Sequence, residues 1–80
     1  MKLPRDLAGR ELANGLCRRW GYREVAQTGS HIIPQTETLT HQRLPIPAHK
    51  VLRIGTLNEI LRLVANHKDV TREAILESIL

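Results

Sequence analysis

The chain lacks phenylalanine, and its aromatic residues are a single tryptophan and a single tyrosine. The core of these 80 residues must therefore be built from leucine, isoleucine, valine and alanine. Each fully buried leucine or isoleucine contributes roughly 1.5–3 kcal/mol, so aliphatic residues can support the fold without a staple. So few aromatic rings leave almost no surface on which single-stranded bases could stack, and any RNA would be recognised through its backbone and shape.

Cysteine is scarce as well. Cys17 is the one cysteine, which excludes an internal disulfide and leaves no cysteine pair for a zinc site. The spacing of His31, His41 and His49 matches no familiar ligand signature, so we expect neither a metal nor another cofactor. Cys17 itself is expected to be a small core residue in a protein of a reducing compartment.

No apolar run is long enough to cross a membrane, and residues 1–6 are polar and interrupted by Pro4. We therefore expect a soluble, cytoplasmic chain without a signal peptide. Its length predicts one domain, residues 1–80, with no room for a deep cavity. The net charge of +4 is compatible with a polyanionic partner but does not demonstrate one.

Helical patterns occur near both ends of the chain. Apolar residues at helical spacing predict a first helix over residues 6–20, with Asp6 as its N-cap and Gly21 just after its end. Thr56 followed by Glu59 is the pattern of a capping box, which predicts the start of a second helix.

The segments 22–27 and 30–33 have the composition of two strands. Thr28-Gly29 between them predicts a two-residue hairpin turn in which Gly29 has positive φ. In this register Ala26 lies across from His31.

A third strand is expected over residues 39–46, at the edge of the sheet because prolines flank Ile46. Pro34 is expected to limit the second strand as an interior strand. A short last helix is expected to start at Asp69 or Thr71. The order is typical of an α+β domain in which helices cover one face of an antiparallel, three-stranded sheet.

His31 is the candidate catalytic residue. Histidine has an ordinary pKa of about 6.5 and can exchange protons near neutral pH, and a hairpin is a rigid mount for such a group. A strand histidine in a small domain is also often an ordinary surface or core residue, and Gly-Ser-His alone does not decide between the two.

Several motifs occur in an order that resembles a known family. They are Leu3-Pro4-Arg5, Gly9-Arg10-Glu11-Leu12, Leu16, Gly21-Tyr22, Gly29-Ser30-His31, Ile46-Pro47-Ala48-His49, Gly55-Thr56-Leu57 and Ile60-Leu61. This set, which spans almost the whole chain, resembles the HicA toxins of type II toxin–antitoxin systems. The resemblance implies a double-stranded-RNA-binding-domain-like fold, α-β-β-β-α, and a ribosome-independent endoribonuclease that cleaves messenger RNA. It also implies that His31 is the essential histidine and that a cognate HicB-like antitoxin covers it.

The chemistry of RNA is consistent with that role. RNA carries its own nucleophile, the 2′-hydroxyl, beside the scissile phosphate, so one positioned base can start transesterification without a metal. Gly29 would allow a phosphate to approach the backbone, and Ser30 can either hydrogen-bond a phosphate or simply start the strand. Basic residues that can contact phosphate, each of which is alternatively a solvated surface charge, are Lys2, Arg5, Arg23, Arg43, Lys50 and Arg53.

Ala26 departs from the family pattern, in which a basic residue is common at this position. Phosphate neutralisation then falls to Arg23, Arg43 or the loop before the second helix. His49 matches the family's Pro-x-His segment, which suggests a loop or packing role.

Three functions remain open on the sequence. The first is a metal-independent endoribonuclease toxin with messenger RNA as substrate. The second is a non-catalytic or weakly catalytic RNA-binding module of the same fold. The third is a protein-interaction subunit whose basic face meets an acidic partner.

Overall fold

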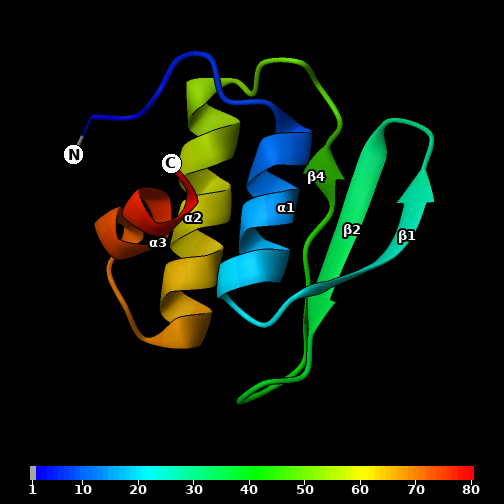
Figure 1. Ribbon diagram of the computed structural model, residues 1–80, viewed down its shortest axis with the longest axis vertical. Coiled ribbons are helices and arrows are strands. Elements are labelled where there is room, and N and C mark those ends of the chain that lie inside the picture. The colour runs from blue at the N-terminus through cyan, green and yellow to red at the C-terminus, as the bar shows by residue number, and fades with distance from the viewer. Residues whose placement is uncertain (1) are drawn as a thin grey trace.

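A computed structural model describes residues 2–80 of the chain. The elements of this part are α1 (Gly9–Arg19), β1 (Arg23–Thr28), β2 (His31–Thr36), β3 (Gln42–Arg43), β4 (Ile46–Pro47), α2 (Ile54–Lys68) and α3 (Arg72–Ile79). The helices all lie on one side of an antiparallel sheet (Figure 1). The predicted α+β class, with helices covering one sheet face, is confirmed.

The sheet has β2 at its centre, with β1 on one side and β3 and β4 on the other. Thr36 pairs with Gln42 in β3, and His31 pairs with Pro47 in β4. The same number of residues separates these two pairs on both strands, so β3 and β4 follow one register along β2. They are two parts of one third strand at the edge of the sheet, as predicted, but this strand begins at Gln42 and not at Leu39, whose φ is 70°, and it ends at Pro47.

Pro34 marks the level at which the sheet is irregular. The sequence predicts that this proline limits β2 as an interior strand, but β2 continues through it to Thr36 and is the central strand. Proline has no N–H for the ladder, and the gap between β3 and β4 lies opposite, where Leu44 donates its N–H to the Pro34 carbonyl (2.9 Å). On the other side, β1 has a bulge between Glu24 and Ala26 at the same level. The irregularities on both sides let the proline be accommodated.

The hairpin between β1 and β2 turns one residue later than the sequence predicts. Thr28 pairs with His31, so the two turn residues are Gly29-Ser30 and Ala26 lies across from Ile33. The predicted pairing of Ala26 with His31 is therefore wrong. Gly29 has the expected positive φ of 52°, and glycine with positive φ at the first central position is typical of a type II′ hairpin turn.

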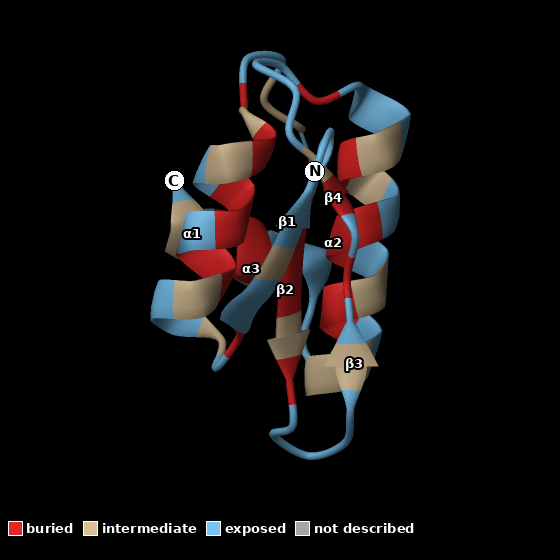
Figure 2. Ribbon diagram, turned by 90° about the vertical axis from the view of Figure 1, so that its right-hand side faces the viewer, coloured by how far each residue is buried: buried red, intermediate tan, exposed pale blue. Residues whose placement is uncertain are grey.

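The core lies between the inner face of the sheet and the helices (Figure 2). Its largest fully buried side chains are Leu12, Leu16, Ile32, Ile46, Leu52, Leu57, Leu61, Ile75, Val64 and Pro34. All but the proline are leucine, isoleucine or valine, as the composition leads one to expect. Cys17 packs against this core, as expected, and burial raises the pKa of its thiol.

The first helix is shorter than predicted. It begins at Gly9 with Ala8 as its N-cap, so Asp6 is not the cap. Ala8 donates its N–H to the Glu11 carboxylate three residues later (3.1 Å), which supplies one half of a capping box. Gly21 follows the C-cap with a φ of 75°, the left-handed conformation that the sequence predicts there.

The second helix starts before its predicted cap. It begins at Ile54, so Thr56 lies within the first turn and the predicted capping box does not form. The Glu59 carboxylate instead accepts two hydrogen bonds from Arg62, of 2.7 and 2.6 Å, on the exposed surface of α2. Of the two starts expected for the last helix, Thr71 is correct, because it is the N-cap and its hydroxyl accepts the N–H of the residue three positions later (3.0 Å).

Two glycines of α1 allow close packing. A Cβ on Gly9 would overlap the backbone carbonyl of Pro47, while the Gly9 N–H donates to the carbonyl of His49 (3.0 Å). A Cβ on Gly15 would lie 2.7 Å from the side chain of Ile79 in α3. The start of α1 is therefore seated directly against the end of β4.

A polar network closes the opposite end of the sheet. The buried hydroxyl of Thr36 donates to the Gly21 carbonyl (3.0 Å) and accepts from the Lys68 ammonium (3.2 Å). The same ammonium lies 4.8 Å from the centre of the Tyr22 ring. Burial lowers the pKa of Lys68 and raises that of Tyr22 to about 12. These contacts attach the end of α2 to the end of β2 that is remote from His31.

Candidate active site on the open face of the sheet

One face of the sheet is not covered by helices, and it turns toward the viewer in Figure 2. Successive side chains of a strand point to opposite faces. Ile32 belongs to the core, so the inner face of β2 carries Ile32, Pro34 and Thr36. His31 and Gln35 therefore lie on the open face.

His31 is the first residue of β2 and is exposed to solvent. Its ring nitrogen Nδ1 lies 3.2 Å from the hydroxyl oxygen of Ser30. When the Ser30 hydroxyl donates to Nδ1, the ring is oriented and the tautomer with a proton on Nε2 is favoured; the reverse donation leaves Nε2 as the acceptor. A ring sealed inside the core could not act on a polymer, and this ring is accessible.

The turn beside His31 is open. Gly29 is exposed, and a Cβ built on it would meet no described heavy atom within 4 Å. The glycine is required by its positive φ and not by a neighbouring group. A ligand can therefore approach the backbone of Gly29 and Ser30 directly, as expected from the sequence.

Two of the predicted phosphate-contacting residues share the open face with His31. Gln35 pairs with Arg23 of β1 on one side and with Arg43 of β3 on the other. Both arginines are exposed, and neither takes part in an ion pair within residues 2–80. This row lies four residues from His31 along β2, roughly 13 Å at the usual rise per residue. The arginines can therefore contact phosphates further along a bound strand, and not the one beside the histidine.

The other predicted basic residues are dispersed. Lys50 and Arg53 are exposed in the loop that follows β4, at the His31 end of the sheet. Arg5 is exposed in the segment before α1, and Lys2 lies beside α3, where it lines a pocket with Glu73 and other residues. Figure 1 shows the N-terminal segment and α3 on the side of the molecule away from β1 and β2. The fold does not bring Lys2 to His31.

The strand pairing continues one step beyond β4. Ala48 donates its N–H to the carbonyl of Ser30 (2.7 Å), and His49 follows directly. The sequence suggests a loop or packing role for His49. The structure places it directly after a residue that is hydrogen-bonded to the hairpin turn. Residues two apart on a strand lie on the same face, so the spacing of Pro47 and His49 could have placed His49 near the hairpin. That inference requires the register of the third strand, which the sequence does not give.

The remaining histidines lie elsewhere. The ring of His41 pairs with the Glu37 carboxylate (2.8 Å), and the ring of His67 contacts the carbonyl of Thr40 (2.8 Å). Within residues 2–80, no group of three or more His, Cys, Asp or Glu side chains is arranged to hold a metal ion. No helix in this part of the chain is long and apolar enough to span a membrane.

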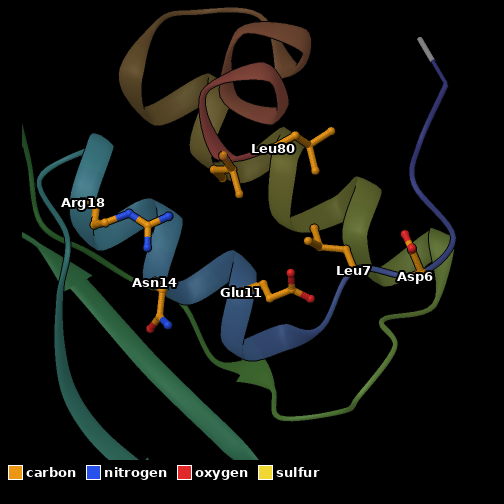
Figure 3. Close-up of a pocket in the computed structure, with 7 residues that line it drawn as sticks. Asp6, Leu7, Glu11, Asn14, Arg18 and Leu80 are labelled. Atoms are coloured by element: carbon orange, nitrogen blue, oxygen red, sulfur yellow. The ribbon is translucent and has the colours of Figure 1, made fainter.

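A pocket on another side of the molecule lies between α1 and the end of the chain (Figure 3). It is lined by Asp6, Leu7, Glu11, Asn14, Arg18, Ile79 and Leu80. Its lining has neither a histidine nor a hydroxyl or thiol nucleophile. It does hold two carboxylates and an arginine, whereas the Gly-Ser-His motif singled out by the sequence lies on the open face of the sheet.

The chain was compared with models of protein families, with curated proteins and with solved structures, and none of the three comparisons finds a match. Functional inference therefore depends on the chain's own residues and their geometry. The feature that carries it is an exposed histidine at the end of a central strand, on the face that also presents Arg23 and Arg43.

Proposed function

We propose that the chain is a metal-independent endoribonuclease of the HicA kind, which cleaves messenger RNA with His31 as general base. The observation that carries the proposal is the position of His31, exposed at the turn end of the central strand on the uncovered face of the sheet. The helix–strands–helix order agrees with the double-stranded-RNA-binding-domain-like fold that the sequence resemblance implies.

The chemistry requires one proton acceptor at His31. The imidazole takes the proton of a ribose 2′-hydroxyl, and the 2′-oxygen attacks the adjacent phosphorus. The bond from phosphorus to the 5′-oxygen breaks, and this oxygen takes up a proton, which leaves a 2′,3′-cyclic phosphate and a 5′-hydroxyl. For this role Nδ1 carries the proton and donates it to the Ser30 hydroxyl oxygen 3.2 Å away, which leaves Nε2 free to accept the proton of the substrate.

The proposal includes a partner for the same face. A HicB-like antitoxin would inhibit the enzyme by lying over the open face of the sheet and covering His31. The exposed ring and the arginines Arg23 and Arg43 offer it polar and cationic contacts, so an acidic surface is the complement expected on the antitoxin.

A second candidate is an RNA-binding module of the same fold with weak or no catalysis. The observation that favours it is the immediate surroundings of His31 in the sheet, where its cross-strand neighbours are Thr28 and Pro47. Neither is basic, and Ala26 lies further along the strand. Transition-state charge at the phosphate would then have little support from the sheet itself.

Incubation with RNA and with DNA of the same sequence, in the presence of EDTA, tests the proposal. Cleavage of RNA alone, unaffected by EDTA, is the expected result, because only RNA carries the 2′-hydroxyl. A salt-sensitive gel shift without cleavage would identify the binding module instead. If the chain associates with neither polymer, a protein-interaction subunit is the correct assignment.

Arg23 and Arg43 supply a prediction about binding. Changing both to glutamine is expected to weaken RNA binding and to lower the salt dependence of log K by about 1.4, at roughly 0.7 per lost phosphate contact on a single strand. Fluorescence anisotropy over a range of salt concentrations measures this slope. Arg62→Gln, on the exposed surface of α2, is the control and should leave the slope unchanged. An unchanged slope in the double variant would show that RNA does not follow the open face.

A further inference from the structure

The paired strands place a second histidine next to the turn that carries His31. The hydrogen bond from the Ala48 N–H to the Ser30 carbonyl (2.7 Å) continues the register in which His31 pairs with Pro47. His49 follows Ala48 directly, two residues beyond the partner of His31.

The backbone carbonyls of Pro47 and His49 are arranged as in a continuing strand. Alternate carbonyls of an extended strand point to the same side, and the carbonyls of Pro47 and His49 both point to the first residue of α1. Gly9 donates its N–H to the His49 carbonyl (3.0 Å), and a Cβ on Gly9 would overlap the Pro47 carbonyl. The pleat therefore places the His49 side chain on the face of Pro47, which is the face of His31.

The separation of the two histidines suits a small bridging group. Diagonal neighbours on paired strands have Cα atoms about 7–8 Å apart, within reach of aromatic side chains. Both histidines are exposed, and a Cβ on the turn residue Gly29 would meet no described heavy atom within 4 Å, so the surface beside His31 is open. A phosphodiester can therefore lie between the two rings, and Lys50 directly follows with a positive charge.

We propose that His49 is a second catalytic residue, the general acid that protonates the leaving group of the cleavage reaction. This assignment rests on the endoribonuclease function proposed above and completes its proton balance. His31 accepts the proton of the 2′-hydroxyl as the bond from the 2′-oxygen to phosphorus forms. The imidazolium of His49 gives its proton to the 5′-oxygen as the bond from phosphorus to that oxygen breaks.

A substrate whose leaving group needs no proton tests whether His49 acts as a general acid or only supports the structure. Loss of a general acid should not slow the cleavage of such a substrate. The experiment compares a diribonucleotide with the para-nitrophenyl ester of uridine 3′-phosphate, because para-nitrophenolate leaves without protonation. For His49→Ala we expect a loss of roughly 10²–10⁴-fold on the diribonucleotide and a rate within a few-fold of the parental chain on the ester. His31→Ala should lose activity on both substrates. Retained activity on the ester also shows that the His49 variant is folded.

Other outcomes would overturn the assignment. Parental cleavage of the diribonucleotide by His49→Ala would remove His49 from the reaction and leave the proposed function intact. An equal loss on both substrates would show a structural role for His49. If the parental chain itself cuts neither substrate, the endoribonuclease function is wrong and the acid role falls with it.

Discussion

Replacement of His31 by alanine is expected to lower the rate of RNA cleavage by roughly 10²–10⁴-fold, the usual contribution of a general base. The fold should be unaffected, because the ring is exposed and the neighbouring Ser30 is its one hydrogen-bond partner within residues 2–80. Initial rates on a fluorescent oligoribonucleotide measure the loss, and a urea unfolding curve checks the stability.

A matched control is available in the same chain. His41 is also exposed, but its ring pairs with Glu37 in the turn region at the opposite end of the sheet. His41→Ala should therefore cleave RNA at the parental rate. If His31→Ala cleaves as fast as His41→Ala, the catalytic assignment of His31 is wrong.

Gly9→Ala is expected to destabilise the fold by about 3 kcal/mol or more. The added Cβ would overlap the carbonyl oxygen of Pro47 and lie 3.0 Å from its carbonyl carbon. These are backbone atoms, which cannot rotate away as a side chain can, so either α1 or β4 must move. A domain of this size has a total stability of roughly 4–12 kcal/mol, and the loss is a large share of it. The midpoint of urea unfolding measures the effect.

The same substitution elsewhere should have the opposite sign. A Cβ on Gly55, in the first turn of α2, meets no described heavy atom within 4 Å. Gly55→Ala therefore adds no clash and restricts the unfolded chain, which should stabilise the protein by about 0.5–1 kcal/mol. If the Gly9→Ala and Gly55→Ala variants unfold at the same urea concentration, the predicted close contact between Gly9 of α1 and Pro47 of β4 is wrong.

Much of the fold could be predicted from local pattern, because apolar periodicity and glycine positions are local signals. The helices, the hairpin and the left-handed Gly21 were predicted in this way. The position of the turn was not, because Thr28-Gly29 and Gly29-Ser30 both give Gly29 a positive φ. The two alternatives pair Ala26 and His31 differently, and tertiary packing selects between them.

Two other errors have different origins. Thr56 and Glu59 have the spacing of a capping box, but α2 begins at Ile54 and Glu59 makes a local i,i+3 pair with Arg62 instead. The sequence predicts that Pro34 limits the second strand. In the structure, irregular pairing with the strands on both sides allows Pro34 to lie within the central strand.

For the candidate site too, local sequence motifs could be recognised, whereas positions that depend on long-range packing could not. His31 could be identified from Gly-Ser-His and from the family resemblance, because that motif is contiguous in sequence. The position of His49 depends on how the third strand aligns with β2, which no local pattern specifies. The separation of Lys2 from the site likewise depends on where the N-terminal segment packs.

The prolines of the broken third strand determine how another molecule can approach the sheet. Leu44 and Ala48 direct their N–H groups toward β2, so the alternate positions, Pro45 and Pro47, face outward and have no N–H to offer. At the opposite margin the bulge of β1 disturbs the row of free donors and acceptors. Neither margin is a good template for β-augmentation or fibril growth. A protein partner is therefore expected to contact the open face of the sheet and not to add a strand at either margin.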